Sequence, residues 1–228
     1  MELVLYIDIA ISVVALISFI FGLRKYVGRR KPLYATMIVF GVGCILLGRS
    51  YTVFRILAGM PVVGIFHAGI LGRVGVFAFF FSSNFGQVDS LVDDGSRSFI
   101  KYRIIAVSGI LITAAIYALI LLSPAGLAEK ISDGLAAAMI APASYFHVKH
   151  IIIPDVDYGV VRCLRGFNTV ALLFGIFSMA ELAVAAYGSV PEPLGLNAVL
   201  YCICGAVLCV LSGILIPVMD RGVRKWSK

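Results

Sequence analysis

Charged residues are scarce in this sequence: they make up 14% of its 228 residues, whereas hydrophobic residues make up 61%. Soluble domains carry about 25% charged and roughly 45–50% apolar residues. The apolar excess is too large for one buried core, so part of it must face lipid. The net charge is +7, but the basic residues lie between apolar runs, which is typical of membrane topology. We therefore expect a lipid bilayer as partner and no nucleic acid.

The sequence also lacks the motifs of the common cofactor and catalytic sites. It has no CxxC, HExxH or GxSxG pattern, and four of its five cysteines lie inside apolar runs. The apolar run 196–218 contains no lysine, which excludes a retinal Schiff base there. His67 and His147 are expected near opposite membrane surfaces, which argues against a haem held by both. We predict no metal, no cofactor and no catalytic residue.

Long apolar runs dominate what is present. A membrane-spanning helix needs about 20 mostly apolar residues. Seven runs of suitable length occur, near residues 3–23, 33–57, 61–82, 103–122, 134–153, 167–187 and 196–218. The sequence therefore predicts an all-α fold, a polytopic bundle of seven transmembrane helices that forms a single domain over 1–228.

The basic residues between these runs predict the orientation. Of the nineteen Lys and Arg residues, fifteen fall in segments on one side of the predicted membrane and only Lys130 falls on the other. Because cytoplasmic loops are enriched in Lys and Arg, the side with fifteen is predicted to be cytoplasmic. The N-terminus would then lie outside and the C-terminus inside, and we expect the plasma (inner) membrane.

Ionisable residues inside the predicted spans are the most informative feature. Each costs about 2.5–3.5 kcal/mol at a helix centre, so each is expected to have a partner or a function. Asp8, Arg49, His67 and Glu181 fall in one layer, on the order of 6–9 Å below the outer surface at the helical rise of about 1.5 Å per residue. Arg73 is expected deeper. This layer predicts either structural ion pairs between helices or a polar pocket.

The pocket interpretation makes a specific prediction about the ligand. Three Arg residues, with Arg55 at the outer boundary, against two acids leave the layer positively charged if His67 is neutral. Arg binds carboxylate or phosphate through two parallel hydrogen bonds. We therefore predict an outward-facing pocket for a small anionic or zwitterionic ligand. The predicted ligand-binding residues are Arg49, Tyr51, Arg73, His67, Glu181, Asp8 and Arg55.

A second polar group lies near the inner surface. His147, Lys149 and His150 close the run 134–153, and we favour a positively charged helix end over a metal or proton site, for which no third ligand is evident. The polar segment 83–102 is expected to be a solvated connector, with a docking loop for a cytoplasmic partner as the alternative.

Three function classes remain open. A receptor or sensor needs only the outer pocket and a cytoplasmic loop, and this is the class we favour. A small facilitative transporter with a 3+1+3 helix arrangement is the alternative, because Phe40-Gly41 and Phe174-Gly175 hint at a repeat. An intramembrane enzyme using Asp8, Glu181 and His67 is the third. The layout is similar in topology alone to seven-helix receptors and to SWEET-type facilitators.

The orientation can be tested by cysteine labelling. In a background without the native cysteines, a cysteine at Ser227 should not react with a membrane-impermeant maleimide in intact cells, because the tail is predicted to be cytoplasmic. A cysteine at Lys130 should react and serves as the control. Rapid labelling at position 227 from outside would overturn the predicted orientation.

Overall fold

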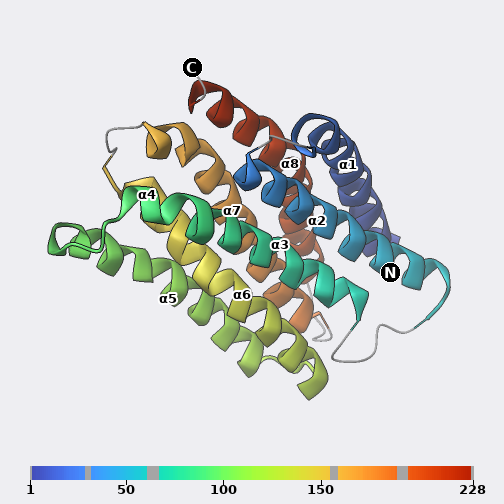
Figure 1. Ribbon diagram of the computed structural model, residues 1–228. Coiled ribbons are helices and arrows are strands. Elements are labelled where there is room, and N and C mark those ends of the chain that lie inside the picture. The colour runs from blue at the N-terminus through green and yellow to red at the C-terminus, as the bar shows by residue number, and fades with distance from the viewer. Residues whose placement is uncertain (1, 29–31, 61–66, 155–158, 189–194, 227–228) are drawn as a thin grey trace.

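All secondary structure in the described part of the computed structural model is helical (Figure 1). The structure describes residues 2–28, 32–60, 67–154, 159–188 and 195–226. The long helices are α1 (Glu2–Tyr26), α2 (Leu33–Leu57), α3 (Ala68–Asn84), α5 (Ile100–Leu122), α6 (Leu127–Ile152), α7 (Val160–Ala186) and α8 (Leu196–Trp226). Between α3 and α5 lie three short turns, η1 (Phe85–Asp89), α4 (Ser90–Val92) and η2 (Arg97–Phe99).

The helices follow the apolar runs, and their ends follow local backbone chemistry. Pro32 precedes α2, where its missing N–H costs nothing. Gly126 precedes α6, and the Gly126 backbone N–H donates a hydrogen bond to the Glu129 side chain. Because of this start, α6 begins well before the predicted bound at 134. The predicted span 61–82 falls partly on residues outside the described ranges, and α3 begins at Ala68.

The bundle closes on itself through the first and last helices. α2 packs between α1 and α3, α7 packs against α8, and α1 packs against α8. α3 and α7 both contact α6, while α5 lies at one edge of the bundle against α6 and α7 (Figure 1). α2 and α3 approach so closely that a Cβ on Gly72 would lie 2.6 Å from the Gly48 Cα. Such small residues allow close backbone contact between helices in lipid.

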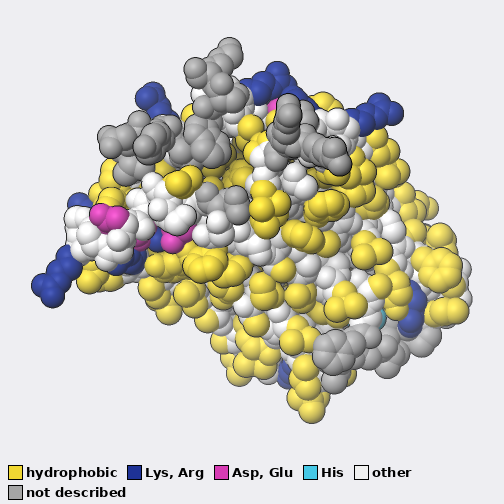
Figure 2. Space-filling view, viewed as in Figure 1, with side chains coloured by type: hydrophobic (Ala, Val, Ile, Leu, Met, Phe, Trp, Pro, Cys, Tyr) yellow, Lys and Arg dark blue, Asp and Glu magenta, His cyan; other side chains and the backbone are white. Residues whose placement is uncertain are grey.

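The outer surface carries many large apolar side chains, as expected for a membrane protein. Ile104, Leu111 and Leu122 on α5 and Ile17 on α1 are more than 60% exposed. Figure 2 shows hydrophobic side chains over much of the visible face, with Lys and Arg gathered mainly toward its upper and left edges. Five of the described helices are long and apolar enough to cross a membrane, namely α1, α2, α5, α7 and α8. The protein is therefore all-helical with the character of a membrane protein.

Candidate functional site

Three of the predicted intramembrane charges form one buried cluster. Arg49 on α2 donates from Nη1 to Glu181 Oε1 at 2.8 Å and from Nη2 to Glu181 Oε2 at 2.5 Å. Its Nη1 also lies 2.7 Å from Asp8 Oδ1. Asp8 and Glu181 are only 1% and 2% exposed. One guanidinium thus holds α1, α2 and α7 together through paired, geometrically favourable hydrogen bonds.

Arg73 completes the charge balance of this cluster but is held loosely. Its Nη2 lies 3.7 Å from Glu181 Oε2, which is too long for a hydrogen bond. The Arg73 side chain is 26% exposed, compared with 13% for Arg49. Two guanidinium groups and two carboxylates leave the cluster neutral. Arg49 is therefore fully engaged, whereas most of the Arg73 donors are available to another group.

The exposed part of Arg73 faces a cavity of about 520 Å³ between α2, α3, α6 and α7. This volume lies in the usual range for small-molecule sites. Its apolar lining includes Val76, Phe77 and Phe174. The polar groups on its walls come from all four helices and from the residue before α3, and they include Arg49, Thr52, His67, Arg73, Glu129, Ser132, Asp133 and Ser178.

Of the remaining predicted ligand residues, His67 lines the cavity, while Tyr51 and Arg55 lie beside it. His67 precedes α3 and accepts a hydrogen bond from the Ile70 N–H at 3.3 Å, so it caps the helix rather than lying within it as predicted. Its ring stacks on Tyr51 with centroids 5.7 Å apart. Arg55 donates to the Tyr51 hydroxyl at 3.0 Å and is not part of the cavity wall. Arg49, Arg73 and His67 thus line the cavity, while Asp8, Tyr51, Arg55 and Glu181 lie around it.

Sequence reasoning missed two acids on the cavity wall, Glu129 and Asp133. Both fall before the predicted span 134–153 and were therefore expected in an external loop, but α6 begins at Leu127 and carries both. Their i, i+4 spacing places them on the same side of a helix, and Gly126 before them is a usual helix start. The expected surplus of positive charge is therefore not found in the cavity wall, because Arg55 lies outside it and Glu129 and Asp133 add two acids.

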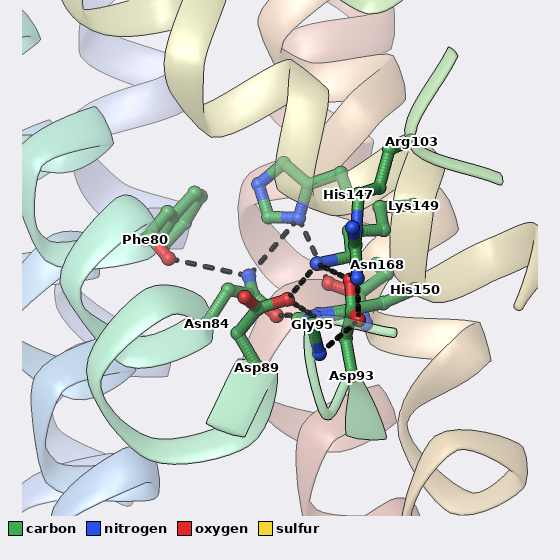
Figure 3. Close-up of polar contacts among 10 residues, drawn as sticks. All are labelled: Phe80, Asn84, Asp89, Asp93, Gly95, Arg103, His147, Lys149, His150 and Asn168. Atoms are coloured by element: carbon green, nitrogen blue, oxygen red, sulfur yellow. Dashed lines mark hydrogen bonds and ion pairs between the residues drawn. The ribbon is translucent and has the colours of Figure 1, made fainter. Parts of the chain in front are cut away.

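A second buried network lies where the α3–α5 connection meets α6 (Figure 3). Lys149 on α6 places Nζ 2.6 Å from Asp89 Oδ1 and 2.6 Å from Asp93 Oδ2. Arg103 on α5 donates from Nε to Asp93 Oδ2 at 2.8 Å and from Nη2 to the other oxygen. Lys149 is only 3% exposed. The acids of the connection thus neutralise the basic end of α6 and fasten the connection to the bundle.

The same network continues into the bundle through histidine and asparagine side chains (Figure 3). His150 Nδ1 lies 2.8 Å from Asn84 Oδ1, and its Nε2 lies 3.2 Å from Asp89 Oδ1. His147 Nδ1 lies 2.9 Å from Asn168 Oδ1. Both histidines and both asparagines are at most 1% exposed.

Because Lys149, His147 and His150 are buried, the inner end of α6 differs from the sequence prediction. The positively charged helix end predicted for α6 is a buried and largely neutralised network. Within the described ranges, no group of three or more His, Cys, Asp or Glu side chains could hold a metal ion. The segment 83–102 is only partly a solvated connector, because Val92 is buried and Asp93 is paired, whereas Asp94 is exposed.

Comparison with known proteins adds no family assignment: no protein-family model matches the chain, and neither curated proteins nor solved structures show significant similarity to it.

The pairing of Asp93 predicts a loss of stability in acid. Hydrogen bonds from Arg103, with Lys149 beside it, hold the pKa of Asp93 well below its usual range. The unfolded value is about 3.9, so Asp93 stabilises the fold above that pH. The stabilisation is lost as pH falls from about 4 toward the lower folded-state pKa. Asp93→Asn should therefore lower the thermal unfolding midpoint at pH 7 and flatten its decline in acid.

Thermal unfolding of the detergent-solubilised protein between pH 7 and pH 3 measures this effect. Asp94→Asn is the matched control, because Asp94 is exposed and hydrogen-bonds to the nearby Ser96 rather than to a basic side chain. An Asp93→Asn variant with the same pH dependence as wild type would contradict the assigned role.

Proposed function

We propose that this protein is a seven-helix membrane receptor or sensor with its N-terminus outside and its C-terminus in the cytoplasm. In this proposal the cavity opens at the outer end of the bundle and binds a small anionic or zwitterionic ligand. One observation supports the proposal above all. The Arg73 guanidinium faces a cavity and makes one loose ion pair among the described residues. An Arg left partly unpaired in a membrane protein needs water or an anionic group beside it.

The burial of the polar residues of α6 supports a count of seven spanning helices. Its polar residues include Ser144, His147, Lys149 and His150, all of which are buried inside the bundle. The side of α6 that faces outward is therefore more apolar than the helix as a whole. α3 has 17 residues, which is at the short end of the range for a spanning helix. Both would cross the membrane beside the five longer helices.

The cytoplasmic side offers a route for a signal in this interpretation. The α3–α5 connection is anchored on α6 through Lys149, and α6 also carries the cavity residues Ser132 and Asp133. A ligand that shifts α6 against α3 would disturb these anchoring ion pairs. The exposed part of the connection, around Asp94, would then contact a cytoplasmic partner.

A transporter is the second candidate, and one observation favours it. Buried polar side chains, Asn84, His147 and Asn168, lie on the inner side of the bundle. Phe80 packs edge-on against both His147 and Phe77, and Phe77 also lines the cavity. A single aromatic layer thus separates the two polar regions. Uptake of radiolabelled solute into liposomes containing the pure protein would favour transport, and binding without uptake would favour a receptor.

Arg73, Arg55 and Arg49 have different contacts, so substituting each of them tests the binding proposal. A thermal-shift screen of small carboxylates and amino acids should find compounds that raise the unfolding midpoint of the wild type. Arg73→Gln should stay folded and lose that shift. Arg55→Gln is the control and should keep it, because Arg55 is outside the cavity wall. Arg49→Gln should destabilise the protein by about 3–5 kcal/mol, because it leaves two buried carboxylates without their main partner.

Two results would refute the binding proposal. One is a screen in which no compound raises the wild-type midpoint. The other is an Arg73→Gln variant that remains folded and keeps the full shift.

A further inference from the structure

We infer that the ligand is a zwitterion, bound with its carboxylate at Arg73 and its ammonium group at Asp133. This inference rests on the proposed function and narrows it. An ion of single charge, anionic or cationic, would satisfy only one of the two groups. The two groups carry opposite charges, face one cavity and do not pair with each other.

Asp133 supplies the negative side of the site. It lies on α6 in the cavity wall and is partly exposed. Within the described part of the chain, its carboxylate makes no hydrogen bond and no ion pair. Its neighbour Glu129, one helical turn earlier, is engaged with the Gly126 N–H at 3.2 Å. Of the two α6 acids on the cavity wall, Asp133 is therefore the one without a hydrogen-bond partner among the described residues, and it can bind a cationic group.

Arg73 supplies the positive side from α3. α3 and α6 pack against each other, and the cavity lies between them and α2 and α7. Arg73 and Asp133 interact electrostatically, yet their charged atoms are not within the 4.0 Å of an ion pair. A direct contact would have removed the need for a ligand. Separated as they are, the two groups can each bind one end of a small molecule.

The electrostatics of a buried site favour such a ligand. A simple carboxylate would neutralise Arg73 and place a second negative charge near Asp133. A simple amine would neutralise Asp133 and place a second positive charge near Arg73. A zwitterion brings no net charge into the cavity and offers each protein group an opposite charge, which reduces the cost of removing charges from water. The Ser132 and Ser178 hydroxyls on the same wall add neutral hydrogen-bonding groups.

The test compares three matched series of compounds on the purified full chain. The zwitterions are the unbranched ω-amino acids from glycine to 6-aminohexanoate. The controls are the acids of equal length, acetate to hexanoate, and the amines of equal length, ethylamine to hexylamine. Each compound is titrated against wild type, Asp133→Asn, Arg73→Gln and the distant control Asp94→Asn, and the thermal midpoint is measured.

We expect at least one ω-amino acid to raise the wild-type midpoint, with its matched acid and amine at least tenfold weaker. Asp133→Asn should remove the preference for the zwitterion over the acid, Arg73→Gln should remove binding of both, and Asp94→Asn should change neither. Acids that bind wild type as tightly as the zwitterions would overturn this inference and leave the proposed anion-binding function standing. An absence of any shift across all three series would overturn both.

Discussion

The contact of Arg49 with Glu181 and Asp8 is the interaction on which the rest of the structure depends. It joins α1 and α2 to α7, which lies more than 100 residues later in the sequence, at a buried point. Each of these charges alone would be costly in an apolar environment. Together they satisfy one another, since one guanidinium donates to both oxygens of Glu181 and to Asp8. Arg49 also lines the cavity, but its donors are engaged, so Arg73 is the guanidinium that is available there.

A second set of charges fixes the opposite end of the bundle. Lys149 and Arg103 hold Asp89 and Asp93, so the connection between α3 and α5 is fastened to α6. Aromatic side chains fill the space between the two charged regions, with Phe77, Phe80 and Phe174 packed ring against ring. The fold therefore has a polar cavity at one end, an aromatic middle and a neutralised polar network at the other end. Both function classes that we propose use this division.

The sequence predicted the helices well because spanning lengths and apolar runs leave few alternatives. The run 33–57 matches α2 residue for residue. The positions of Asp8, Arg49 and Glu181 along their helices also predicted that they would share a layer. In the structure Arg49 contacts both acids. Hydropathy predicted the start of α6 wrongly, because polar residues in its first turns moved the predicted start from Leu127 to residue 134. That error placed Glu129 and Asp133 in a loop and left them out of the predicted pocket, whose positive surplus came from counting Arg55.

The pairing of the inner residues could not be predicted for a different reason. His147 and His150 were visible as a cluster, but their partners Asn84, Asp89 and Asn168 lie more than 15 residues away in the sequence. Hydropathy and spacing describe one helix at a time and contain no information about which helices pack together. Only the arrangement of α3, α6 and α7 showed that these groups form one network.

A double-mutant cycle on Arg49 and Glu181 tests the central claim most directly. Unfolding free energies of the wild type, Arg49→Met, Glu181→Met and the double variant would be measured in mixed detergent micelles. A buried, directly bonded pair predicts a coupling of about 2 kcal/mol or more, with the double variant less destabilised than the sum of the single ones. Strictly additive effects would contradict the account, because they would show that these two side chains do not depend on each other.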